Sequence, residues 1–221
     1  MIDIKTYKES YNHANVYRIS SEDGDILVDP AIDIEDVEDI ERIKYILVTH
    51  AHYDHIRTIE DWGKIPSIKC IYAHSLSKEV FLDPFENCSS LFMDYRTFNV
   101  DYKEVKDGDI IDLMKNLRIR IYHLPGHSRD SVAFLFQEKI ENEYKNCFFV
   151  SGDLIFADSI GRSDLPGSSP QDLRNSLRRF VNLYDSEKID KNLYIYPGHS
   201  IKTNLDDELK SNVFLSKEFL Y

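Results

Sequence analysis

The sequence predicts a mixed α/β domain, and three observations support this. Short runs rich in β-branched and aromatic residues, such as residues 45–48, are typical of buried strands. Between these runs lie stretches with apolar residues at helical spacing, for example residues 173–184. The composition, 42% hydrophobic and 30% charged, suits a soluble α/β protein. Because 221 residues are too few for two ordinary domains, we expect residues 1–221 to form one domain.

We expect strands wherever a short run is apolar or alternates apolar with polar residues. These runs are residues 15–19, 26–28, 45–48, 68–73, 110–113, 117–122, 132–136, 147–150 and 193–196. The first two are joined by a turn at residues 22–25 and make residues 1–30 a β-meander. Asp29 follows this meander and has two interpretations. Its carboxylate orients a metal-binding histidine, or it starts a turn before Pro30.

Helices are predicted from apolar spacing in four stretches. These are residues 33–43 with Asp33 as N-cap, the residues after 53 with Ile56, Ile59 and Trp62 on one face, residues 75–83, and the stretch that starts at Ser169. The last combines a capping box with a proline at the first helical position. Residues 138–146 are expected to be an acidic loop. Residues 84–105 are interpreted either as a lid or wall of a substrate site or as a flap packed on the core, and we favour the flap.

Residues 49–55, Thr-His-Ala-His-Tyr-Asp-His, place four metal-ligand side chains directly after a predicted buried strand. While the chain stays extended, His50 and His52 point to the same side. If it then turns into a helix, Asp54 and His55 lie in the first turn and face another direction, so one loop serves two metals. Three imidazoles and a carboxylate this close together would repel and desolvate one another without a cation. The motif therefore predicts a metal site rather than a polar loop.

Three further predicted strands lead to side chains of the same kind. They run from residues 117–122 to His127, from residues 147–150 to Asp153 and from residues 193–196 to His199. His127 and His199 each follow a Pro-Gly pair, which makes a tight turn at the end of the strand. Since α/β scaffolds build their sites where separate strand ends converge, we expect these side chains to meet residues 49–55 in one cleft.

The motif His50-x-His52-x-Asp54-His55 after a strand resembles the signature of the metallo-β-lactamase-fold hydrolases. The resemblance covers nearly the whole chain. Residues 151–156, 159–167, 196–199 and 212–214 look like the glyoxalase II-like branch and the small bacterial hydrolases beside it. This resemblance implies a four-layer αβ/βα sandwich of two similar halves, with metals at the edge of the sheets.

The resemblance also implies a ligand set. A first metal would be held by His50, His52 and His127, a second by Asp54, His55 and His199, and both would share Asp153 as a bridge. These residue types suit two zinc ions, and such sites also accept iron, manganese or cobalt. Asp54 would in addition orient the nucleophile. His13, His74 and His123 would then be structural residues. Of the three, His123 is the one we expect to contact a metal-binding side chain.

In glyoxalase II, a basic residue that matches Arg162 holds a substrate carboxylate, so the resemblance implies this role here. The alternative is a surface arginine paired with Asp158 or Asp164. Two departures argue against glutathione as the thiol. Ile201 stands where a tyrosine is expected, and only 22 residues follow His199 where the C-terminal glutathione-binding domain would begin. We therefore expect smaller acidic thioesters to be preferred.

Charge and cysteine content bear on the other classes of function. A formal net charge of −12 argues against nucleic acid, which needs clustered Lys and Arg. No run approaches the roughly 20 apolar residues of a membrane span, and the first twenty residues lack the apolar segment of a signal peptide. We therefore expect a cytoplasmic protein that acts on a small molecule, with no preference for an oligomeric state. Cys70, Cys88 and Cys147 are expected to be buried free thiols.

These observations and the resemblance together predict a binuclear metallo-hydrolase in which a metal-bridging hydroxide attacks a carbonyl, most plausibly of a thioester. β-Lactam hydrolysis is disfavoured because β-lactamases of the commonest class have cysteine where this chain has Asp153. The alternative from another class is a mononuclear iron oxygenase of persulfides, which uses two histidines and one aspartate on the same fold. A third is a module with an inert metal site. Retention of Asp54, His55 and His199 favours two metals.

Overall fold

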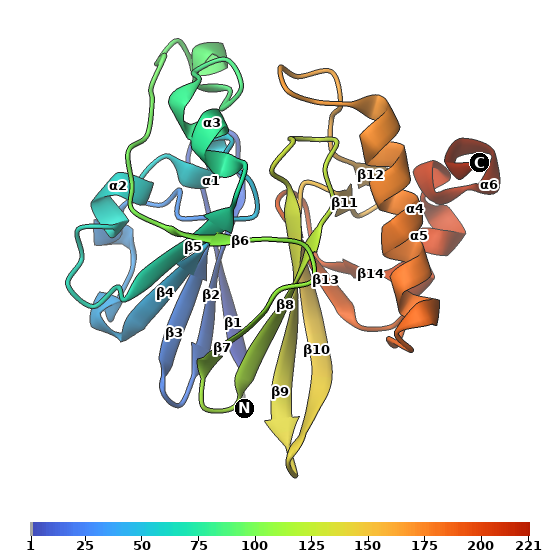
Figure 1. Cartoon of the computed structure of the whole chain (residues 1–221), viewed down its shortest axis with the longest axis horizontal. Helices are drawn as coiled ribbons and strands as arrows, with labels where there is room; N and C mark the ends of the chain where they lie inside the picture. Colours follow the sequence, from blue (N-terminus) through green and yellow to red (C-terminus); the bar gives the residue numbers. More distant parts are fainter. Residues whose placement is uncertain (1) are drawn as a thin grey trace.

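The computed structural model describes residues 2–221 and consists of two six-stranded sheets that face each other, with helices on the outer side of each (Figure 1). The strand order is β1-β2-β3-β4-β5-β6 in one sheet and β14-β13-β10-β9-β8-β7 in the other. Each sheet with its helices comes from one half of the chain. The predicted four-layer αβ/βα sandwich of two similar halves is therefore confirmed.

The first sheet combines a meander with parallel strands. Its strands are β1 (Asp3–Lys8), β2 (Asn15–Ser21), β3 (Gly24–Val28), β4 (Ile43–Leu47), β5 (Cys70–His74) and β6 (Lys103–Val105). β1, β2 and β3 pair antiparallel, as predicted for residues 1–30, whereas β3 to β6 pair parallel. Because parallel strands end at the same edge, the residues that follow β3 and β4 lie side by side there. β6 is a strand within the stretch 84–105, where none was predicted.

The outer layer of this half is made of short helices and turns. They are η1 (Ile34–Asp36), η2 (Ile40–Arg42), α1 (Tyr53–Ile56), α2 (Ile59–Trp62), α3 (Ser77–Leu82) and η3 (Ser89–Phe92). The helix expected after residue 53 is broken in two at Thr58, which leaves helical geometry with φ −111° and whose backbone N donates to Pro30 O at 3.3 Å. Its predicted apolar face, which includes Trp62, is nevertheless buried.

The prediction of a helix at residues 33–43 is wrong. The chain forms two 3₁₀ turns there, separated by extended Val37 and by Asp39 in the left-handed region with φ 48°. Asp33 makes no capping hydrogen bond with its side chain. Aspartates compete for backbone hydrogen bonds in non-helical conformations, so a stretch rich in them favours turns over a helix.

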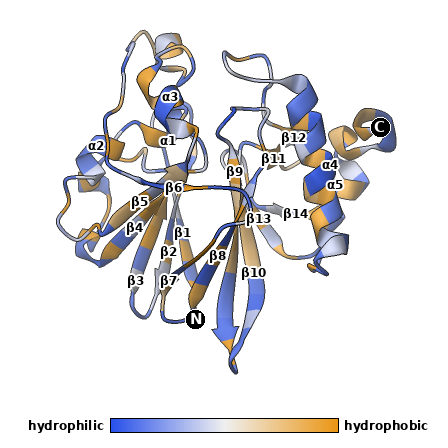
Figure 2. Ribbon diagram, in the orientation of Figure 1, coloured by the Kyte–Doolittle hydropathy of each residue, from blue (hydrophilic) through white to orange (hydrophobic). Residues whose placement is uncertain are grey.

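The second sheet is mostly antiparallel. Its strands are β7 (Ile110–Met114), β8 (Leu117–His123), β9 (Val132–Ile140), β10 (Glu143–Gly152), β13 (Tyr194–Pro197) and β14 (Thr203–Asn204), and β11 (Ile155–Phe156) with β12 (Ser159–Ile160) forms a separate ribbon. The acidic loop predicted at 138–146 is wrong, because β9 and β10 continue into a long hairpin. The hairpin turns at Glu141 and Asn142, with φ 50° and 69°, as a tight hairpin turn requires. Its far end is largely hydrophilic (Figure 2), which hid the strand pattern.

The helices of the second half are α4 (Pro170–Ser186), α5 (Leu205–Ser211), η4 (Val213–Leu215) and α6 (Lys217–Leu220). α4 begins as predicted, with Pro170 at its first position and Ser169 Oγ accepting from Asp172 N at 3.2 Å. Its buried face packs on the outer side of the second sheet, where Phe180 contacts Phe149. Within residues 2–221, every helix is too short or too polar to cross a membrane. Cys70, Cys88 and Cys147 are unpaired, but only Cys88 is buried.

Candidate metal centre

The side chains predicted to bind metal come from both halves of the sandwich and lie together at one edge. They form three overlapping groups, in each of which the candidate ligand atoms lie within 4.8 Å of one another. The groups are His50–His52–His127, His50–His55–Asp153 and Asp54–His55–His199. Each strand end predicted to supply a ligand residue thus brings it to the same place.

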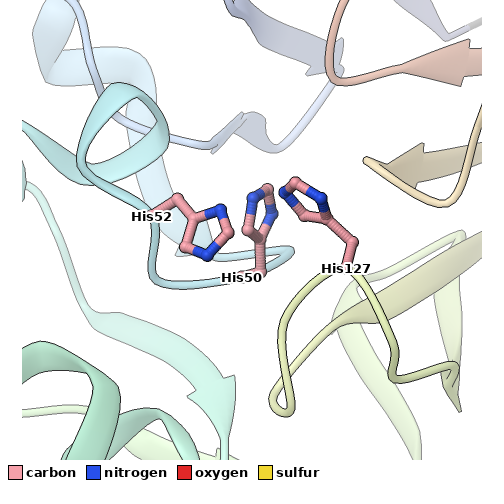
Figure 3. Close-up of side chains that lie close together, drawn as sticks. All are labelled: His50, His52 and His127. Carbon is pink, nitrogen blue, oxygen red and sulfur yellow. The ribbon is translucent and has the colours of Figure 1, made fainter. Parts of the chain in front are cut away.

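His50, His52 and His127 form one half of this cluster (Figure 3). The three rings face a common space, with ring centroids 4.6 to 4.9 Å apart and nearly perpendicular planes. His50 and His52 follow β4, and His127 lies in the loop between β8 and β9. The alternation of side chains in an extended segment explains why His50 and His52 share a side.

Asp54, His55 and His199 form the other half, and Asp153 lies between the halves. Asp54 Oδ2 is 3.2 Å from His199 Nε2. Asp153 Oδ1 is 3.4 Å from His55 Nε2, while its Oδ2 is 3.4 Å from His127 Nε2 and 3.5 Å from His199 Nε2. The Asp153 carboxylate therefore touches members of both halves, which is the position that a bridging ligand requires.

Several buried polar atoms of the cluster lack hydrogen-bond partners. Within the described chain, five of them are shielded from solvent and make no hydrogen bond, namely Nε2 of His50, His52, His55 and His127 and Oδ1 of Asp153. Each such atom costs about 1–3 kcal/mol when left unsatisfied. Divalent cations would satisfy these atoms together, and imidazole with carboxylate suits zinc, iron or manganese. The donor set fits metal binding.

The electrostatics of the cluster also favour metal binding. Burial, reinforced by repulsion from neighbouring imidazoles, lowers the pKa of His50 and His52 far below the usual range, so both are neutral. Burial also opposes charge on His55, but Asp153, Asp54 and Asp29 outweigh it and raise the pKa of His55 to about 10. The carboxylates around His55 thus favour positive charge at this place, which a divalent cation would supply.

Comparison with known proteins decides the family. The family model described as the metallo-beta-lactamase superfamily matches residues 11–199. The chain belongs to this superfamily. With the His/Asp cluster, this identifies a metallo-hydrolase, and proteins of the superfamily typically use two metal ions.

Three similar proteins illustrate the range of this superfamily. The hydroxyacylglutathione hydrolase GloC of Haemophilus influenzae is 29% identical over 196 residues, which cover 84% of this chain and 82% of that protein. The B3 metallo-beta-lactamase BLEG-1 superposes with a TM-score of 0.82 at 26% identity and covers 97% of this chain and 100% of that one. TTHA1623, solved in a di-iron-bound form, superposes with a TM-score of 0.76 at 25% identity over 96% and 100% of the two chains.

In this metallo-β-lactamase superfamily member, Asp29 supports the cluster from behind. Its Oδ1 accepts from Thr49 N at 2.7 Å, and its Oδ2 accepts from Thr49 Oγ1 at 2.7 Å and lies 2.9 Å from His55 Nδ1. Of the two interpretations of Asp29, the one in which its carboxylate orients a histidine of the site is therefore confirmed. Asp29 itself has φ 56°, so it also turns the chain.

Two polar residues that sequence reasoning missed also hold the superfamily motif. Asn12 Nδ2 donates to Asp54 Oδ2 at 2.7 Å from the loop between β1 and β2. Buried Asp130 accepts from Ala51 N at 3.1 Å and Ser77 Oγ at 2.7 Å, and its other oxygen accepts from Ser128 Oγ. Asp130 thus joins the loop of His50 and His52 to the loop of His127. Its place just after His127 was the only sequence signal.

The remaining histidines lie outside the three groups. His13 is exposed in a turn, with φ 59°. His74 and His123 stack on each other with ring centroids 4.0 Å apart. Burial and the neighbouring His123 lower the pKa of His74 to about 4. His123 Nε2 lies 2.8 Å from Arg129 O. Among the described residues, no contact of His123 with a metal-binding side chain supports the expectation.

A pocket of about 190 Å³ opens onto the cluster. Besides His52, Asp54, His127, Asp153 and His199, it is lined by Asn12, Cys88, Leu91, Phe92, Phe156, Arg162 and Leu165. The Arg162 guanidinium is two-thirds exposed and pairs with Asp164 through two contacts of 2.9 Å. Arg162 therefore makes the surface ion pair considered as the alternative, and it also borders the pocket.

Proposed function

We propose that the protein is a binuclear metallo-hydrolase of thioesters. The observation that carries this proposal is the clustering of seven ligand residues, five of which have an unpartnered buried atom, with Asp153 in contact with both halves of the cluster. His50, His52 and His127 would hold one metal, and Asp54, His55 and His199 the other. Zinc is the metal we propose, with iron or manganese as substitutes.

When bound, two divalent ions at this place would supply Lewis acidity and an activated water. Asp54 borders the pocket, and Asn12 fixes one of its oxygens. We assign it the role of orienting the water by accepting a hydrogen bond. Phe92, Phe156 and Leu165 border the reacting group with apolar surface, which limits access of bulk water and strengthens the polar contacts inside.

The choice of a thioester is supported by GloC, which is named a hydroxyacylglutathione hydrolase and resembles this chain over most of its length. We propose a small-molecule substrate and a cytoplasmic location, with which three unpaired cysteines are compatible. β-Lactam hydrolysis is the second candidate, because BLEG-1 is described as a B3 metallo-beta-lactamase. The argument against it from Asp153 concerns only the commonest class of β-lactamases.

Metal content and substrate range test the proposal together. Protein purified without chelator is expected to hold close to two divalent metals per chain, because seven clustered ligand residues exceed the needs of one ion. Elemental analysis measures this, and a panel of thioesters, β-lactams and a persulfide with an oxygen electrode measures activity. The variant His13→Ala, outside the cluster, should keep two metals. One iron per chain with oxygen uptake on the persulfide would contradict the proposal in favour of the oxygenase.

Arg162→Ala is expected to raise KM for anionic thioesters far more than it lowers kcat. Loss of a charge-assisted hydrogen bond amounts to about ten- to a hundredfold in kcat/KM. The lower end is expected, because Arg162 is mostly exposed and its charge is already paired with Asp164. Steady-state kinetics on an acidic and a neutral thioester measure it. Arg118→Ala, which removes another paired surface arginine, is the control, and identical kinetics for both variants would exclude the clamp.

A further inference from the structure

The segment 85–96 forms one wall of the pocket and carries an unusual amount of exposed apolar surface. Phe85, Leu91, Met93 and Tyr95, hereafter the rim patch, are 58%, 60%, 85% and 60% exposed. The rings of Phe85 and Tyr95 pack edge to face, with ring centroids 6.2 Å apart. Water-facing side chains of this size on one short segment favour a binding role, since exposed apolar clusters mark interaction sites.

The wall is held firmly by polar contacts on its inner side. Buried Asn87 accepts from Tyr53 N at 2.7 Å through its carbonyl oxygen, and its side-chain amide donates to Arg96 O at 2.8 Å. Glu86 pairs with Arg129, which lies two residues after His127. The wall is therefore tied to the loop of His50, His52 and His55 and to the loop of His127. Its exposed side chains sit on a fixed support rather than on a free loop.

Backbone strain in the segment 85–96 also indicates a binding role. Cys88, Met93 and Tyr95 have φ of 63°, 59° and 45°, in the left-handed region that non-glycine residues avoid. Such residues persist only where the surrounding structure dictates them, and they cluster at ligand sites. The strained backbone at Met93 and Tyr95 presents two of the four side chains of the rim patch.

The rim patch is continuous with the pocket. Leu91 belongs to both, since it is exposed and also lines the pocket beside Phe92. Phe92 in turn packs on Tyr53 of the metal-cluster loop, with ring centroids 5.2 Å apart. The pocket of about 190 Å³ has room for about six groups the size of a water molecule, each taking ~30 Å³. A thioester with a few carbons fills it, and exposed Leu91 at its border gives a longer chain an apolar surface to lie on.

From this continuity we infer that the rim patch binds the apolar acyl chain of the substrate, so that the preferred thioesters carry a medium-length aliphatic acyl group. The inference rests on the proposed function and replaces the small acyl group expected from the sequence with a longer one, so that a carboxylate held by Arg162 would belong to the thiol part of the substrate. A chain that leaves the pocket past Leu91 would shield the rim patch from water, as the hydrophobic effect favours.

A ladder of straight-chain acyl thioesters of N-acetylcysteamine, from acetyl to decanoyl, tests the inference on the metal-loaded protein. We expect kcat/KM to rise by about two- to fourfold per methylene once the chain outgrows the pocket, as burial of a methylene predicts. The gain should lie mainly in KM. Leu91→Ser and Met93→Ser should each lower the ratio of octanoyl to acetyl kcat/KM at least fivefold. Val213→Ser, equally exposed but on η4, should leave this ratio unchanged.

A binding measurement separates this inference from the proposed function. Calorimetry with S-octyl and S-ethyl thioethers of N-acetylcysteamine, which cannot be cleaved, should show tighter binding of the octyl compound, and Met93→Ser should remove the difference. If acetyl thioesters are cleaved but chain length has no effect, the inference is overturned and the function stands. If no thioester is cleaved, the function fails and the thioether titration alone decides. A dimer that Met93→Ser dissociates, without a chain-length effect, would assign the patch to a second copy and overturn the inference.

Discussion

Asp153→Ala is expected to lower turnover more than about 100-fold and to leave no more than one metal per chain. Its two oxygens contact His55, His127 and His199 at 3.4–3.5 Å, so its loss removes the one carboxylate that touches both halves of the cluster. Loss of a residue that only supports a metal ligand already costs about 10- to 100-fold. Loss of a ligand shared by both ions should exceed that. Elemental analysis and steady-state kinetics on the same preparation measure the two effects.

Two further variants make the Asp153 result specific. Asp153→Asn keeps the shape of the side chain but not its charge, so it should also lose metal, though less completely than alanine. Asp112→Ala removes an exposed carboxylate on β7 that pairs with Arg118 and belongs to none of the three ligand groups, so it should keep metal and activity. Two metals per chain in Asp153→Ala would show that another arrangement holds the ions.

That the ligand residues lie together was predictable, because the sequence pattern that reveals each of them spans only a few residues. An apolar run followed within a few residues by histidine or aspartate identifies a strand end, as at Val48 before His50 and at Val150 before Asp153. The period of two in an extended chain then places His50 and His52 on one side. Neither inference needed knowledge of which strands are neighbours in the sheet, only that strand ends converge.

Residues that act across the fold were not predictable in this way. Asn12 reaches Asp54, 42 residues further on, and Asp130 reaches Ala51, 79 residues back. Both are polar residues in loops, where asparagine and aspartate commonly serve turns, so their separation in sequence from Asp54 and Ala51 carries no signal. The role of Asp130 follows only from the packing of one half on the other, and that of Asn12 from the packing of two loops within the first half.

The segment 84–105 shows a mixture that local pattern could not resolve. The favoured interpretation, a flap packed on the core, holds for buried Phe98, which contacts Phe81. The other interpretation, a wall of the site, holds for Leu91 and Phe92. Apolar residues that face the core and apolar residues that face a pocket have the same composition. Only tertiary contacts, such as that of Asn87 with Tyr53, separate them.

Gly198→Ala is expected to reduce activity about as severely as Asp153→Ala, through steric displacement. A β-carbon at this position would lie 2.0 Å from Asp153 Oδ1 and 2.7 Å from His55 Cε1, closer than such atoms approach in proteins. The backbone cannot retreat, because Gly198 N donates to Gly152 O at 2.8 Å and Gly198 O accepts from Asn15 N at 2.6 Å. The Asp153 carboxylate must therefore move, and we expect loss of one metal and a fall in kcat/KM of about 100-fold.

The comparison with Gly63→Ala shows whether Gly198→Ala acts through the metal cluster. A β-carbon on Gly63, at the end of α2, would lie 3.3 Å from Val100 Cγ2, 3.4 Å from Ile59 O and 3.5 Å from Ile71 Cδ1. Only the Val100 contact is tighter than an ordinary one, and that side chain can shift slightly. That variant should bind two metals and keep its activity. Circular dichroism should show that both variants are folded, since the β-carbon of Gly198→Ala points at the cluster and not into the apolar core. If Gly198→Ala binds two metals and turns over like the parent, the carboxylate of Asp153 does not occupy the position from which we infer the bridge.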